Sequence, residues 1–115
     1  MKRRGHITFT LLFTAIAIYA IDRMYFDLPS LIVALGVGEA ILASAIPDIL
    51  EPGGSTSHRK GSHSWRVLGA SLIVCGVGLY LLPQDVAYWH AIFFLPWGYA
   101  THLLADALTP AGLPF

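Results

Sequence analysis

Hydrophobic and polar positions alternate along this chain in long blocks. Turn-forming or charged residues separate four apolar runs, which extend over residues 7–26, 29–50, 65–82 and 86–108. Each run is close to the roughly 20 residues that a helix needs to cross the hydrocarbon core of a bilayer. A helix also satisfies its own backbone hydrogen bonds, as the lipid interior requires. The pattern therefore predicts an all-α integral membrane bundle of four transmembrane helices, forming a single domain over residues 1–115.

Prolines and glycines mark the ends of the predicted helices. Pro29 suits the first turn of the second helix, because its missing N–H is not needed there. The sequence Pro52-Gly53-Gly54-Ser55 ends that helix, and Pro83-Gln84-Asp85 forms a tight turn before the fourth. Pro96 lies inside the fourth run and predicts a kink, since it removes one helical hydrogen bond.

Composition supports a membrane protein. Hydrophobic residues make up 56% of the chain and charged residues only 12%, about half the roughly 25% charged of soluble domains. Seven basic residues balance seven acidic ones, so no basic surface for nucleic acid is expected. The single cysteine, Cys75, excludes an internal disulfide and is interpreted as a small buried or lipid-facing hydrophobic residue. Membrane lipid is the expected surrounding partner.

The distribution of Lys and Arg predicts an orientation. Three basic residues precede the first run, and three more, Arg59, Lys60 and Arg66, lie in or beside the polar 51–65 loop. Only Arg23 lies between the first two runs, and the turn at 83–85 has none. The positive-inside rule then places both termini and the 51–65 loop on the cytoplasmic side of a plasma or inner membrane.

A secretory signal peptide is an alternative interpretation of the first run. Ala15-Ile16-Ala17 resembles a small-residue cleavage site after a short apolar core. An even number of spans and the use of His6 described below favour a retained first helix.

This topology brings six potential metal ligands to the cytoplasmic face: His6, Asp48, His58, His63, His102 and Asp106. His102 and Asp106 are four residues apart and so project from one side of a helix. Imidazole and carboxylate ligands suit zinc first, with manganese or iron as alternatives. Ionisable groups in spanning helices are costly, which favours a functional interpretation.

Each ligand also has a simpler interpretation. His6 can be an interfacial histidine, and the 51–65 loop can be a basic segment that contacts anionic lipid headgroups. His102 and Asp106 can form a hydrogen-bonded pair within one helix. Glu39, in the middle of the second run, can pair with Arg23 or with a histidine in the bundle, and His90 is assigned to the opposite face. None of these alternatives explains why six ligands share one face.

Three segments carry a resemblance to a known family. These are Pro47-Asp48, the histidine loop His58-Arg59-Lys60-Gly61-Ser62-His63-Ser64, and the stretch from His102 to Gly112. They resemble the YdjM-type family, whose small multi-pass membrane proteins are described as metal-dependent hydrolases and whose pattern is approximately PDxD, HRGxTHS and HxxxDxxTxxG. A histidine near the N-terminus also recurs in the family and matches His6.

This chain departs from the family pattern at two places. Leu50 replaces the second aspartate of PDxD, with Glu51 beside it, and Gly61 comes one position late, with Ser62 in place of threonine. The resemblance implies a fold of several membrane-spanning helices and metal-dependent hydrolysis. The missing aspartate leaves the number of metals open.

The combined hypothesis is a membrane hydrolase that acts by metal-activated water. Asp48 or Glu51 would orient or deprotonate the water, and Arg59 would bind a phosphate or carboxylate oxygen. The depth of the site predicts a phosphoester or other amphiphilic, lipid-like substrate. Two alternatives are metal-ion binding or transport through Glu39, and a scaffold whose basic loop binds a soluble partner or lipid. The absence of HExxH disfavours a zincin-type protease.

Overall fold

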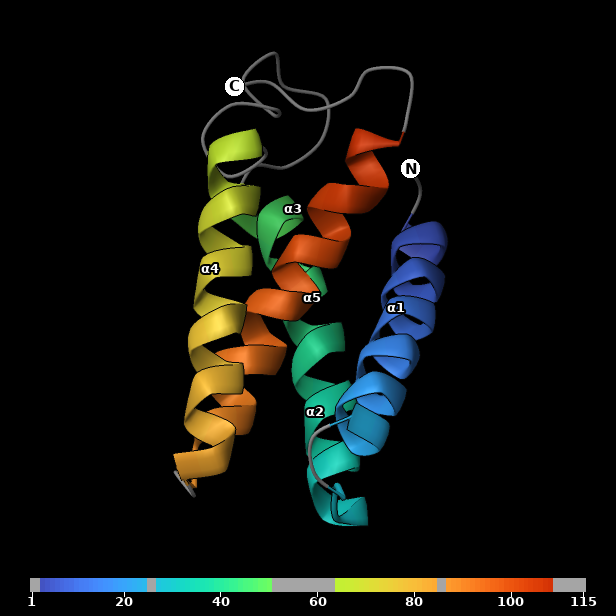
Figure 1. Cartoon of the computed structure of the whole chain (residues 1–115). Coiled ribbons are helices and arrows are strands. Elements are labelled where there is room, and N and C mark those ends of the chain that lie inside the picture. Colours follow the sequence, from blue (N-terminus) through green and yellow to red (C-terminus); the bar gives the residue numbers. More distant parts are fainter. Residues whose placement is uncertain (1–2, 25–26, 51–63, 85–86, 109–115) are drawn as a thin grey trace.

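The computed structural model describes residues 3–24, 27–50, 64–84 and 87–108. In these ranges the chain is helical and has no strand, which confirms the all-α prediction (Figure 1). The elements in order are α1 (Arg3–Met24), α2 (Ser30–Ser44), α3 (Ile46–Leu50), α4 (Trp65–Leu81), the short 3-10 helix η1 (Leu82–Gln84) and α5 (Trp89–Ala107).

The second predicted helix is interrupted at Ala45, between α2 and α3. The Ala45 N–H donates to Leu42 O at 3.2 Å, a tighter turn than in an α-helix. Pro47 follows two residues later, and its ring and missing N–H disfavour a continuous helix here. The interruption sets the direction of α3, which carries Asp48.

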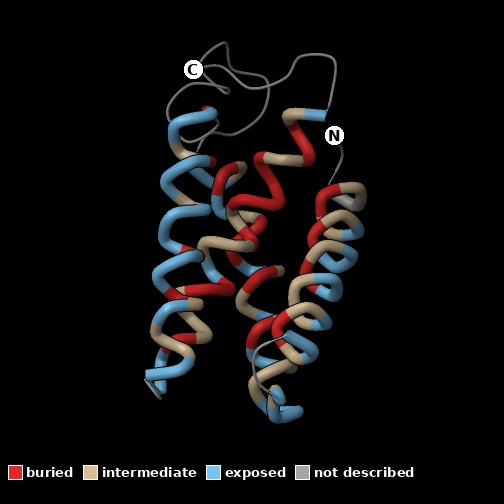
Figure 2. The backbone as a smooth tube through the Cα atoms, viewed as in Figure 1, coloured by how far each residue is buried: buried red, intermediate tan, exposed pale blue. Residues whose placement is uncertain are grey.

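Within the part of the chain that the structure describes, three segments are long and apolar enough to cross a membrane, namely Gly5–Met24, Ser30–Leu50 and Trp65–Gln84. Large apolar side chains such as Leu12, Leu31 and Ile73 are exposed on these segments, whereas Thr10 and Thr14 of α1 are buried. A water-soluble bundle has the reverse arrangement, so the structure supports a membrane protein. Figure 2 shows that the exposed positions lie on the outer faces of α1 and α4.

Helix α5 lies at the centre and packs against α1, α2 and α4 (Figures 1 and 2). Its contact with α2 is tight at Gly98, where an added Cβ would lie 2.1 Å from the backbone oxygen of Ala40. Gly78 of α4 is similarly tight, since a Cβ there would lie 2.7 Å from the Phe93 nitrogen. Small residues at these crossings let the helices approach closely, as is common in membrane bundles. Pro96 lies inside α5, and the kink there stays a prediction.

Polar side chains fix the rotation of α1 against α5. Thr101 donates to the Gly98 carbonyl at 2.8 Å, which leaves its oxygen to accept from Thr10 at 2.8 Å. At the other end of α1, Asp22 accepts from the Leu28 N–H at 2.7 Å and closes the connection to α2. With Thr10 held against α5, the face of α1 that carries His6 one turn earlier also points at α5.

Candidate metal centre

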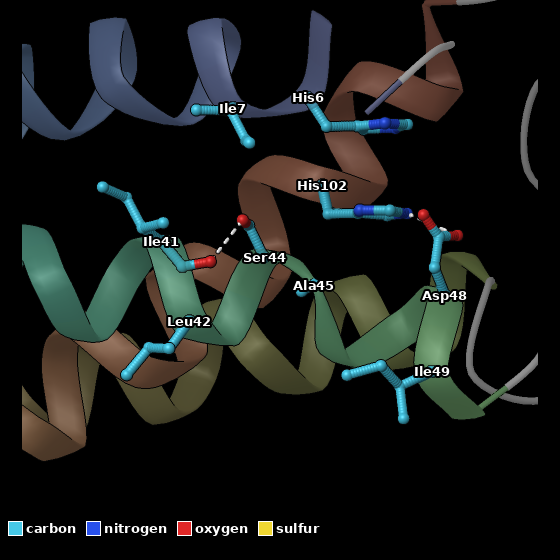
Figure 3. Close-up of a pocket in the computed structure, with 9 residues that line it drawn as sticks. All are labelled: His6, Ile7, Ile41, Leu42, Ser44, Ala45, Asp48, Ile49 and His102. Atoms are coloured by element: carbon cyan, nitrogen blue, oxygen red, sulfur yellow. Dashed lines mark hydrogen bonds and ion pairs between the residues drawn. The ribbon is translucent and has the colours of Figure 1, made fainter. Parts of the chain in front are cut away.

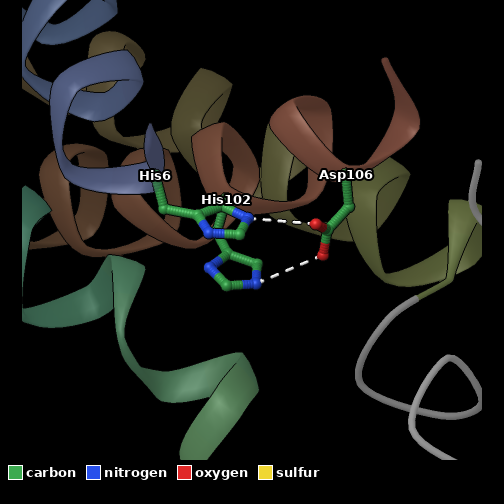
Figure 4. A group of neighbouring side chains, drawn as sticks. All are labelled: His6, His102 and Asp106. Atoms are coloured by element: carbon green, nitrogen blue, oxygen red, sulfur yellow. Dashed lines mark hydrogen bonds and ion pairs between the residues drawn. The ribbon is translucent and has the colours of Figure 1, made fainter. Parts of the chain in front are cut away.

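Three ionisable side chains from two helices meet at one end of the bundle. His6 comes from α1, and His102 and Asp106 come from α5. All three are buried, with 4%, 1% and 4% of their surface exposed, and one potential ligand atom of each lies within 4.8 Å of the others. Figure 4 shows both rings directed toward the carboxylate of Asp106.

The two imidazole rings are stacked face to face. Their centroids are 3.9 Å apart, and their planes differ by only 5°. Nε2 of His6 donates to Oδ1 of Asp106 at 3.0 Å, and Nε2 of His102 lies 3.3 Å from Oδ2 of the same residue. Each oxygen of Asp106 therefore faces one ring, and the parallel stacking directs both Nε2 atoms to the same side.

A second carboxylate approaches from a third helix. Oδ1 of Asp48, on α3, lies 3.5 Å from Nε2 of His102 (Figure 3). The side chain of Asp48 is 38% exposed, whereas that of Asp106 is only 6% exposed. Asp48 thus lies at the open edge of the cluster and Asp106 at its closed side.

The periodicity of the helices explains this convergence. His6, Thr10 and Thr14 are spaced by four residues on α1 and are all buried, so they form one polar stripe on the bundle-facing side. His102 and Asp106 have the same spacing on α5. This stripe on α1 is visible in the sequence, and it is the signal that predicts which face of the first helix turns inward.

A cavity of about 350 Å³ adjoins the cluster, between α1 and the α2–α3 segment. Its lining consists of His6, Ile7, Ile41, Leu42, Ser44, Ala45, Asp48, Ile49 and His102. Figure 3 shows the two rings and Asp48 at one end of this group and Ile7 and Ile41 at the other. The cavity thus joins an ionisable end to an apolar one.

The structure brings together four of the predicted ligands: His6, Asp48, His102 and Asp106. The remaining predicted site residues, His58, His63, Glu51 and Arg59, lie outside the described residues.

Glu39 pairs with His90 of α5. Its Oε1 lies 2.9 Å from Nδ1 of His90, and both side chains are 19% exposed. Of the two predicted partners, a histidine is therefore correct and Arg23 is wrong. The Arg23 guanidinium lies instead over the Tyr19 ring, 5.9 Å from its centroid. No spacing in the sequence indicates this pair, because it joins α2 to α5.

Comparisons with family models, curated proteins and solved structures returned no match. The resemblance to the YdjM-type family consequently stays a prediction.

Proposed function

We propose that this chain is a membrane-embedded, metal-dependent hydrolase. The observation that carries the proposal is the convergence of two buried imidazoles and a buried carboxylate on one point, with a second carboxylate at the open edge. Such residues within or beside spanning helices are costly unless they serve a site. The resemblance to the YdjM-type family supports the same reaction class.

The donor set fits a divalent metal ion. Zinc lies about 2.0–2.2 Å from nitrogen and oxygen ligands, so two ligands of one ion are at most about 4.4 Å apart. The three ligand atoms lie within 4.8 Å of one another, so only small movements are required. Nε2 of His102 is 3.3 and 3.5 Å from two carboxylate oxygens, close to the separation of neighbouring ligands in a tetrahedral zinc site. These separations suit ligands that surround an ion.

We expect the buried residues to bind the metal ion and the more exposed residue to act on the attacking water. His6, His102 and Asp106 would hold the ion, which when bound supplies Lewis acidity and hydroxide near neutral pH. Asp48 is more exposed, and it would either complete the ligand set or orient the attacking water and take its proton. His58 and His63 are proposed as further ligands, Glu51 as an alternative base and Arg59 as the group that binds a substrate oxygen.

The proposal includes a location and a substrate class. Helix α5 would be the fourth span, which puts the cluster on the cytoplasmic face of a plasma or inner membrane. Zinc is the first choice of metal, ahead of manganese and iron. A phosphoester or another amphiphile is the proposed substrate, because the site would lie at headgroup depth.

Chelation and metal replacement test this function. Detergent-purified protein would be stripped with a chelator and reloaded with zinc, manganese or iron, and hydrolysis of a panel of phosphoesters and carboxylic esters would be followed. We expect activity to disappear with the metal and to return with one of the three ions. Metal that binds stoichiometrically without any hydrolysis would instead favour a metal-binding or transport protein.

A further inference from the structure

We propose that the cavity beside the metal centre binds the hydrocarbon chain of an amphiphile that enters sideways from the lipid between α1 and the α2–α3 segment. The polar head of this amphiphile would reach His6, Asp48 and His102. This inference rests on the proposed function and specifies its substrate as a molecule with both a metal-binding head and an apolar chain.

The lining of the cavity has the required chemistry. One end carries both imidazoles and the carboxylate of Asp48, and the other is walled by Ile7 from α1 and Ile41 from α2 (Figure 3). Ser44, between them, donates its hydroxyl to the Ile41 carbonyl at 2.7 Å. The Ser44 hydroxyl therefore already has a hydrogen-bond partner and does not need one from a ligand in the apolar part of the cavity.

Exposed apolar side chains line the cavity on the side of a segment that could span a membrane. Leu42 and Ile49 line the cavity and are 73% and 69% exposed. Both belong to Ser30–Leu50, a segment long and apolar enough to span a membrane, so in a bilayer these large apolar side chains would lie against lipid. A ligand that enters there passes from the bilayer to the metal centre without crossing water.

The size of the cavity distinguishes an amphiphile from a small anion. Its volume of about 350 Å³ is near the lower end of the roughly 300–1,000 Å³ of small-molecule sites. Free phosphate would occupy only the ionisable end and would leave the isoleucine-lined part unused. A lipid and a soluble phosphoester can carry the same polar head group. Only the lipid also has a hydrocarbon chain that would fill the apolar part of the cavity.

Binding of two phosphonate probes tests the inference without requiring hydrolysis. Zinc-loaded protein in detergent micelles would be titrated with methylphosphonate and with dodecylphosphonate. Ala45→Phe fills the cavity from the α2–α3 side, and Ile7→Trp fills it from α1, so failure of one variant to fold leaves the other. Ala70→Phe and Ile73→Trp are matched controls on exposed positions of α4.

We expect each cavity-filling variant to weaken dodecylphosphonate binding by about tenfold or more, as steric exclusion from an apolar pocket commonly does. Methylphosphonate binding and zinc content should stay within about twofold of wild type, and the α4 controls should change neither probe. The same protein and detergent are used for both probes, so partitioning into micelles cancels in the comparison of variants.

Two outcomes would overturn the inference, and they are distinguishable. If zinc and methylphosphonate bind normally and the filled variants still bind dodecylphosphonate like wild type, the cavity does not hold the chain and the metal centre stands. If wild type binds neither zinc nor methylphosphonate, the proposed function fails and the inference fails with it.

Discussion

Among the described residues, histidine and carboxylate side chains join α5 to other helices at two places, and the two places differ in kind. Near the start of α5, His90 meets Glu39 of α2 in a single contact of 2.9 Å, with the Trp89 ring 6.4 Å away and edge-on. Near its end, two stacked imidazoles meet Asp106, and Asp48 approaches one of them. The same residue types thus form a closed pair at one place and an open cluster at the other.

The difference shows what separates a structural contact from a candidate site. Glu39 and His90 pair one to one and join α2 to α5, as polar side chains do between packed helices of membrane proteins. In the cluster, two carboxylates approach the same imidazole nitrogen, and a cation bound between them would offset their like charges. A histidine beside a carboxylate is therefore weak support for a metal centre, whereas convergence from three helices is much stronger.

The largest effect should come from removing a histidine at each place. His102→Ala removes a proposed ligand and should lower kcat/KM by at least about a hundredfold, since even residues that only orient ligands are worth about 10–100-fold. His90→Ala should leave kcat/KM within a few-fold of wild type. Steady-state kinetics on the best substrate found for the metal-loaded protein would measure both. If kcat/KM fell equally in both variants, the proposed difference between the Glu39–His90 pair and the metal centre would be wrong.

A smaller effect is expected at the crossing of α2 and α5, which lies between the two places along α5. Gly98→Ala puts a Cβ 2.1 Å from the Ala40 oxygen, so the helices must separate, at a cost of about 1–3 kcal/mol for overpacking. Gly69→Ala is the matched control, because nothing lies within 4 Å of its added Cβ. Unfolding in mixed micelles would give both free energies. Similar stability for the two variants would show that the crossing is looser than described.

The smallest effect should be the coupling within the closed pair. A double-mutant cycle of Glu39→Ala and His90→Ala should give a coupling free energy of about 0.6 kcal/mol and no more than about 1.7 kcal/mol, the range found for polar contacts between membrane helices. The same unfolding assay applies. A coupling near zero would mean that the 2.9 Å contact contributes nothing to helix association.

The sequence predicted those features of the fold and of the site that depend on the pattern within each helix and on the order of the helices. The apolar runs predicted the all-helical fold, and the order of the spans predicted that His6, Asp48, His102 and Asp106 lie at one end. The four-residue spacing of His102 and Asp106 placed both on one face, as observed.

The relative rotation of the helices could not be predicted in the same way. Whether Glu39 meets Arg23 or His90 depends on how closely α2 approaches α5, and that approach is set by Gly98 against the Ala40 backbone. The interruption at Ala45 was also missed, because a 21-residue apolar run hides a local change of helix direction that positions Asp48. The cavity follows from these tertiary details and has no signature in the sequence.

Metal content in two matched carboxylate-to-amide variants tests the central claim most directly. Asp106→Asn and Glu39→Gln each remove one charge from beside a histidine while keeping side-chain shape. Elemental mass spectrometry of detergent-purified protein should find at least one equivalent of zinc, manganese or iron in wild type and in Glu39→Gln, and much less in Asp106→Asn. Absence of metal from well-folded wild type after reloading, or equal metal in both variants, would contradict a metal centre at His6, His102 and Asp106.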